Sequence, residues 1–140
     1  MKQRVGDGNA ERGSGLVEMA LTLPLVLLVS LVIIQFGVTA FAGSAAEAAA
    51  RQGARVGSVA QVNPASYAVA EAQRVAFTSF SAGNPQVIAL APGGVVGSEL
   101  TLRVTYEVPN FIGFLGGLFA GLPSDSIMVS GQASFRREGW

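Results

Sequence analysis

The sequence predicts an α+β protein: a long N-terminal hydrophobic helix, then a small domain with one helix and a roughly three-stranded antiparallel sheet. Two patterns predict this class. Residues 19–46 carry no charged side chain, and residues 99–108 alternate between apolar and polar side chains, which is typical of a half-buried strand. We divide the chain into a leader (1–13), a transmembrane helix with its stalk (14–60) and an extracytoplasmic domain (61–140).

The composition excludes most kinds of chemistry. The chain has 140 residues, a formal net charge of zero, and neither cysteine nor histidine. Disulfides, thiol nucleophiles, Ser-His-Asp triads and the usual zinc sites are therefore excluded. No phosphate-binding glycine loop is present. We predict no enzymatic activity, no cofactor, no metal and no nucleic-acid partner. Glu107 and Asp125 are interpreted as solvated carboxylates rather than an acid–base pair.

The leader predicts the orientation of the chain. Residues 1–13 are polar and have no apolar face to bury, so we expect them to be disordered. Lys2, Arg4 and Arg12 precede the apolar run, and basic flanks stay in the cytoplasm. We therefore expect a single-pass protein of the cytoplasmic (inner) membrane, with a cytoplasmic N-terminus and an extracytoplasmic C-terminal domain.

The apolar run is long enough to cross a bilayer. Its 28 residues reach about 42 Å as a helix, against about 30 Å for the hydrocarbon core. Glu18 directly precedes the run and therefore lies at the membrane edge or within it. Ionisable groups are expensive at that depth, which makes Glu18 a functional candidate. Pro24 interrupts the backbone hydrogen bonding and predicts a kink.

The second half of the predicted helix changes in composition. Residues 37–46 are mostly small, which favours close approach of a packing partner over their being simple helix filler. Glu47, Arg51 and Arg55 recur every four residues and mark an exposed face of a helical stalk. Residues 40–42 resemble a signal-peptidase site, but the apolar core is longer than that of a signal peptide and the helical pattern continues through it.

The remaining residues predict the outer domain. Asn63 is expected to cap a helix that starts at Pro64 and runs to about residue 81. Its expected apolar set is Tyr67, Ala70, Val75, Phe77 and Phe80. Strands are expected at residues 86–91, 99–108 and 127–135. In the second strand one face is expected to be apolar: Leu100, Leu102, Val104, Tyr106 and Val108.

An apolar, glycine-rich segment lies between the last two strands, at residues 109–123. The 12-residue stretch at 111–122 is too short to span a bilayer. We interpret it as a loop folded over the sheet. The alternative is a loop that contacts lipid or a partner.

Four segments resemble TadE-like pseudopilins of tight-adherence (Flp) pilus systems: residues 12–19, 20–25, 49–55 and 135–138. The first is similar to a prepilin processing signal, with Gly13 before the cut and Glu18 five residues after it. The resemblance implies cleavage between Gly13 and Ser14 by a membrane aspartyl prepilin peptidase. Flp-type signals usually place an aromatic residue after the glutamate, where this chain has Met19.

The resemblance also implies a function and partners. It indicates a minor pilin or pseudopilin that helps to assemble an adhesive pilus, with prepilin peptidase, other pilin subunits, the assembly platform and membrane lipid as partners. Cleavage would create an ammonium on Ser14, and in a filament this group could face Glu18 of a neighbouring subunit. Glu18 would then serve subunit docking. The alternative is a membrane-anchored extracytoplasmic binding module with an uncleaved signal-anchor.

Overall fold

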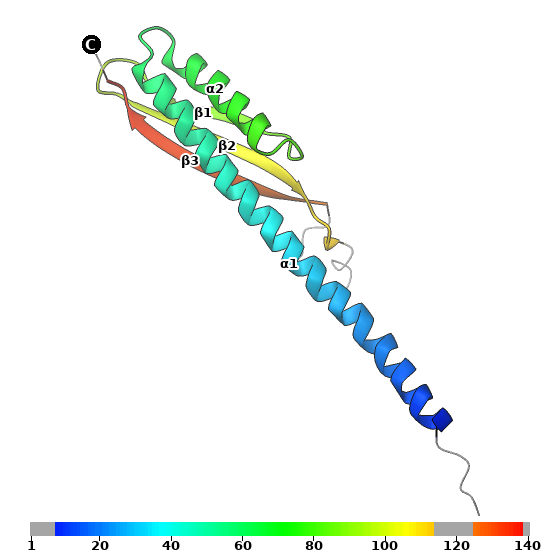
Figure 1. Ribbon diagram of the computed structural model, residues 1–140. Helices are drawn as coiled ribbons and strands as arrows, with labels where there is room; N and C mark the ends of the chain where they lie inside the picture. Colours follow the sequence, from blue (N-terminus) through cyan, green and yellow to red (C-terminus); the bar gives the residue numbers. More distant parts are fainter. Residues whose placement is uncertain (1–7, 114–124, 139–140) are drawn as a thin grey trace, which may run out of the picture. The chain divides into compact units, whose positions relative to one another are not determined.

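The computed structural model describes residues 8–113 and 125–138, with side chains from Gly15 onward. It consists of two helices and three strands in the order α1 (Gly8–Val59), α2 (Pro64–Ser79), β1 (Gln86–Pro92), β2 (Glu99–Pro109) and β3 (Ser126–Arg136) (Figure 1). The predicted α+β class is confirmed. The chain forms two compact units, of which the first ends at Ile34 and the second begins at Gln35.

The first unit is the N-terminal part of α1. The expected disorder of the leader is wrong for residues 8–13, which are helical, while residues 1–7 lie outside the described part. The hydroxyls of Thr22 and Ser30 donate to the carbonyls of Glu18 and Val26, at 2.7 and 2.8 Å, as expected for hydroxyls in an apolar helix. The helix continues through Pro24, and the kink stays a prediction.

The second unit contains the sheet, whose strands lie in the order β1-β2-β3 and are all antiparallel. The three predicted strands are therefore confirmed to within one residue at each end. Val104 at the centre of β2 pairs with Val87 on one side and Gly131 on the other. The pairing of β1 is irregular between Ala89 and Ala91, which is typical of a β-bulge.

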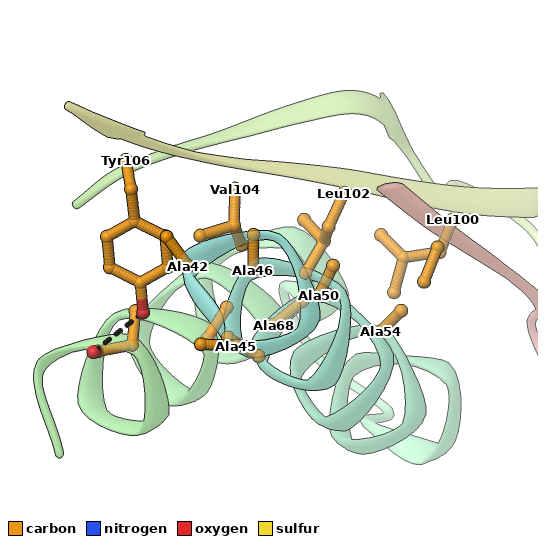
Figure 2. Packing of buried hydrophobic residues seen from close by; sticks show 14 of the residues in the cluster. Ala42, Ala45, Ala46, Ala50, Ala54, Ala68, Leu100, Leu102, Val104 and Tyr106 are labelled. Atoms are coloured by element: carbon orange, nitrogen blue, oxygen red, sulfur yellow. Dashed lines mark hydrogen bonds between the residues drawn. The ribbon is translucent and has the colours of Figure 1, made fainter. Parts of the chain in front are cut away.

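One face of the sheet forms the core together with both helices. The predicted apolar face of β2 is confirmed, because all five of its side chains are completely buried. Figure 2 shows four of them pointing from β2 toward the helices. The helices contribute almost only alanine to this core. The alanines are Ala42, Ala45, Ala46, Ala49, Ala50 and Ala54 of α1 and Ala68, Ala72 and Ala76 of α2.

The second half of α1 lies along β2 and runs in the opposite direction. Gln35 contacts Pro109 at one end of the strand. At the other end, a Cβ added to Gly57 would lie 2.5 Å from Leu100. The intervening 22 helical residues rise about 33 Å, and the nine strand steps rise about 30 Å, so the two elements have matching lengths.

This packing makes the second half of α1 one wall of the core. The small residues of α1 are buried by the sheet and by α2, so the expected close packing occurs within the chain. The charged face is exposed as predicted. Arg51 pairs with Glu47, but both side chains are more than half exposed, so the pair contributes little to stability.

The helix α2 begins at Pro64 as predicted but differs in two respects. Asn63 makes no side-chain cap and adopts the left-handed conformation, with φ at 47°, and its carbonyl accepts from the amide of Ser66 at 3.0 Å. The expected apolar face is confirmed only for Val75 and Phe80, which pack against the core, and is wrong for Tyr67, Ala70 and Phe77, which are exposed. Alanines face the core instead, since α2 approaches α1 too closely for larger side chains.

Two glycines lie where α1 comes closest to α2 and to β3. A Cβ on Gly53 would lie 2.6 Å from the carbonyl oxygen of Ala68 in α2. A Cβ on Gly131 would lie 2.3 Å from the backbone amide nitrogen of Glu47 and 2.5 Å from the carbonyl carbon of Ala46. Because backbone atoms cannot rotate away as side chains do, these positions fix the spacing of α1 from α2 and from β3.

Tyr106 connects β2 to α2 at the other end of the core. Its buried hydroxyl donates to the carbonyl of Ala76 at 2.7 Å (Figure 2). Its ring meets Phe80 edge-on, with centroids 5.4 Å apart, and Phe80 meets Phe41 of α1 at 5.9 Å. Burial raises the pKa of the Tyr106 phenol above its usual value.

Gly131→Ala is expected to lower the free energy of unfolding by about 1–3 kcal/mol, because the new methyl group must push β3 away from the backbone of α1. Denaturant unfolding in detergent, followed by circular dichroism, measures the loss. Gly94→Ala is the matched control, since a Cβ there meets nothing within 4 Å. Equal stability of the two variants would contradict the close approach.

Tyr106→Phe is expected to cost about 1–2 kcal/mol, because the buried hydrogen bond from the hydroxyl to the carbonyl of Ala76 is lost. The folded-state pKa of Tyr106 lies above the unfolded value of about 10, so the folded state holds this proton more tightly. That contribution is complete below pH 10 and is lost as the pH rises through the folded-state pKa. Unfolding curves from pH 8 to 11 should therefore converge for the native chain and the variant. A constant difference would show that Tyr106 does not titrate as expected.

Candidate functional site

Glu18 lies on a part of α1 that is surrounded by exposed apolar side chains. Its neighbours Leu16, Val17 and Met19 are 71%, 61% and 65% exposed. The carboxylate forms no ion pair with any described residue. Around it the helix surface has a shallow, open hollow of about 710 Å³, lined by Gly15, Leu16, Glu18, Met19 and Thr22. An acidic group in such surroundings needs a partner, and the side chains described from Gly15 onward do not supply one.

The other predicted site residues lie on the same helix. Gly13 and Ser14 are both helical, although their side chains are outside the described part. Glycine costs about 1 kcal/mol relative to alanine in a helix, so Gly13 and Gly15 make this turn easier to unwind. Pro24 lacks an amide hydrogen, which leaves the carbonyl of Ala20 without its helical donor. Four predicted residues thus share one helix, with Glu18 between the cleavage position and the proline.

Gln35 is a functional candidate whose contacts the sequence did not predict. It lies in the apolar run, yet its side chain is only 3% exposed. Its Oε1 accepts from the amide of Phe111 at 2.8 Å, and its Nε2 donates to the carbonyl of Pro109 at 3.3 Å and to Thr39 Oγ1 at 3.4 Å. Gln35 therefore fixes the start of the apolar segment at 109–123, of which residues 114–124 lie outside the described part.

Arg137, near the C-terminus, connects three segments of the second unit. Its guanidinium donates to the carbonyls of Gln61 at 2.7 Å and of Ala60 at 3.4 Å, both just after α1, and to the carbonyl of Gly94 between β1 and β2. Its backbone also pairs with Ser98 and Gly97. These contacts give Arg137 a structural role, because carbonyls of its own chain accept from both of its terminal nitrogens, while its buried Nε has no partner among the described residues.

The described residues offer no catalytic centre. Residues 8–113 and 125–138 contain no cluster of three acidic side chains that could hold a metal. Glu107 and Asp125 are both exposed. Glu71 receives two hydrogen bonds from Arg74, at 2.6 and 2.9 Å, which lower the pKa of the Glu71 carboxyl. That pair lies on the surface of α2, and its charges are already satisfied.

One comparison with known protein families found a match, and it lies within α1. The model of the TadE-like protein family matches residues 13–55. The match covers residues 13–55 alone, and over this segment the chain is similar to the TadE-like family. No curated protein and no solved structure matches the chain.

The TadE-like segment begins at Gly13 and ends at Arg55, so it covers the exposed part of α1 and most of its buried alanine face. The family acts in Tad pilus assembly, is associated with membranes and is generally non-enzymatic. The helix agrees with that setting, because residues 15–59 are long and apolar enough to include a membrane span.

Sequence reasoning identified Glu18 from its position before the apolar run, whereas it missed the contacts of Gln35. A signal for Gln35 was present. Among the polar side chains of the run, hydroxyls can bond back to the helix, as Thr22, Ser30 and Thr39 do. An amide has more donors and acceptors than the helix satisfies, which indicates a partner outside the helix.

Glu18→Ala is expected to leave the unfolding free energy of the second unit unchanged within about 0.5 kcal/mol, because Glu18 is exposed and lies outside that unit. Denaturant unfolding in detergent tests this. A loss above 1 kcal/mol would show that Glu18 supports the fold, and its role in partner binding would then lose its basis.

Proposed function

We propose that this chain is a minor pilin or pseudopilin that acts in the assembly of a tight-adherence (Flp, type IV-related) pilus. A prepilin peptidase cleaves it between Gly13 and Ser14. It resides in the cytoplasmic membrane with its second unit outside the cytoplasm, and its other partners are pilin subunits and the assembly platform. The observation that carries this proposal is the exposed Glu18, which has no ion pair with a described side chain, within the segment that matches the TadE-like family.

Electrostatics gives Glu18 its role in this proposal. Cleavage exposes an ammonium on Ser14, four residues from Glu18 and therefore on the same side of the helix. When two such helices pack side by side, the ammonium of one subunit can meet the carboxylate of the next. Desolvation offsets much of the attraction, so the gain lies in register: a misplaced subunit leaves a charge unpaired in apolar surroundings.

The packing of the second unit supports different roles for the two halves of α1: the second half packs within the chain, and the first half contacts other subunits. The alanine face from Ala42 to Ala54 is already covered by the sheet and α2. By contrast, the apolar side chains at 15–27 that the structure describes are almost all more than half exposed. Contacts between subunits are therefore assigned to the N-terminal half of the helix, where Glu18 lies.

The second candidate is a membrane-anchored extracytoplasmic binding module that keeps its leader. The backbone is helical across Gly13 and Ser14, and cleavage would first have to unwind this turn. This observation favours the anchored module. The length of the mature chain distinguishes the two functions.

Mass spectrometry of the protein from its own host is expected to find a mature chain that begins at Ser14. Glu18→Ala should be cleaved normally yet fail to enter or support pili, whereas Glu107→Ala, which removes an exposed carboxylate from β2, should behave as the native chain. An intact leader would favour the anchored module. Normal piliation with Glu18→Ala would refute the docking role.

A further inference from the structure

The contacts of Gln35 place the start of an apolar segment at a defined point along the membrane helix. The amide of Phe111 and the carbonyl of Pro109 are both hydrogen-bonded to the Gln35 side chain, at 2.8 and 3.3 Å. Whatever depth Gln35 has in a bilayer, residues 109–111 therefore share it within a few ångströms. The depth of Gln35 follows from counting along the helix.

A hydrocarbon core of about 30 Å takes about 20 helical residues. If the core begins at Met19, directly after Glu18, it ends near Val38 and includes Gln35. If Glu18 is drawn inside and the core begins at Ser14, it ends near Ile33, about 3 Å before Gln35. For every placement between these two, Gln35 lies within about two turns of the outer boundary of the lipid.

The loop base, defined here as residues 109–113, has the chemistry of a segment that enters lipid. It has no charged side chain, and Phe111 is 48% exposed. Phe36, which follows Gln35 on α1, is 72% exposed. In water, exposed apolar side chains such as these have an unfavourable free energy of hydration. In the lipid interface they would contact acyl chains, and this cost would be removed.

Every backbone amide of the loop base has an acceptor, which favours its entry into lipid. Pro109 has no amide hydrogen, and Gln35 satisfies the amide of Phe111. The amide of Asn110 donates to the carbonyl of Asp125 at 3.3 Å. The two remaining amides, of Ile112 and Gly113, donate to Asn110 Oδ1 and to its carbonyl, at 3.2 and 3.3 Å. Water is therefore not needed to satisfy any of these donors.

The charged group beside the loop base sets the limit of insertion. Asp125 is exposed and its backbone is bonded to Asn110. A carboxylate is expensive in hydrocarbon, so Asp125 must remain on the water side. This combination, with Phe111 apolar and Asp125 charged, fits the boundary between acyl chains and headgroups rather than the middle of the bilayer.

We infer that the loop base, positioned by Gln35, is a second membrane contact that inserts into the lipid interface on the outer side. The inference rests on the membrane span of the proposed function. It gives Gln35 the role of a positioning residue and makes lipid the partner of Phe111. The second unit would then contact the membrane at the loop base in addition to its connection through α1.

Depth-dependent quenching of tryptophan fluorescence tests this inference. In the full chain with Trp140→Phe, single tryptophans are introduced as Phe111→Trp, Leu27→Trp or Phe77→Trp, and each protein is placed in phosphatidylcholine vesicles with lipids brominated near the headgroup or near the chain end. Leu27 lies in the span, and Phe77 is an exposed residue of α2. Phe111→Trp should be quenched at least threefold more than Phe77→Trp, most strongly by the shallow bromines, and Leu27→Trp most strongly by the deep ones.

Variants of Gln35 test its positioning role. Gln35→Met matches the length of the side chain but removes both bonds to the loop base, and it should reduce quenching of Phe111→Trp at least twofold with Leu27→Trp unchanged. Thr39→Val is the matched control, since Thr39 bonds to Gln35 but not to the loop base, and it should leave quenching unaltered. Circular dichroism of the same samples reports whether the sheet is retained. If Gln35→Met unfolds the sheet, the lipid contact is judged from the quenching of Phe111→Trp in the otherwise native chain.

The outcomes separate the two proposals. If Leu27→Trp is not quenched, the chain does not span the bilayer, and both the proposed function and this inference are overturned. If Leu27→Trp is quenched while Phe111→Trp behaves as Phe77→Trp, the span stands and only the lipid contact is refuted. Unchanged quenching in a folded Gln35→Met protein would refute the role of Gln35.

Discussion

The fold depends on the short distance between the second half of α1 and the elements around it. Alanines and glycines form most of that helix face, and Gly131 lets the backbone of β3 reach the backbone of α1 at Ala46. Dispersion forces fall steeply with separation, so a seam of small side chains stabilises only while the contact stays tight. One larger residue in this seam would separate the helix from the sheet along much of its length.

The sequence predicted those parts of the fold whose pattern has a single meaning. Strict alternation from residue 99 to 108 can only be a strand with one buried face, and β2 is that strand. Alanine has no such single meaning, because it is both a good helix former and a small core residue. The apolar face expected for α2 therefore included Tyr67 and Phe77, while the buried positions are Ala68, Ala72 and Ala76.

The candidate site was predictable to a different extent. Glu18 is identifiable from composition alone, because an acid beside a long apolar run needs a reason, and the described helix leaves it exposed. The geometry of docking could not be predicted, since one chain does not contain the partner that would pair with it. Gln35 shows the opposite case. Its partners are in the chain, but they lie 74 and 76 positions away, beyond the reach of local pattern.

The helix α1 is both the apolar helix and one wall of the core. A force that pulls on its N-terminal half would therefore act directly on the contacts of the core. Tension applied along the helix axis would pass into the alanine seam as shear, spread over contacts from Ala42 to Ala54 that would have to slip together. Peeling, in which contacts fail one at a time, is not available to elements that lie side by side over about 30 Å. A core built in this way therefore resists such tension through many contacts at once.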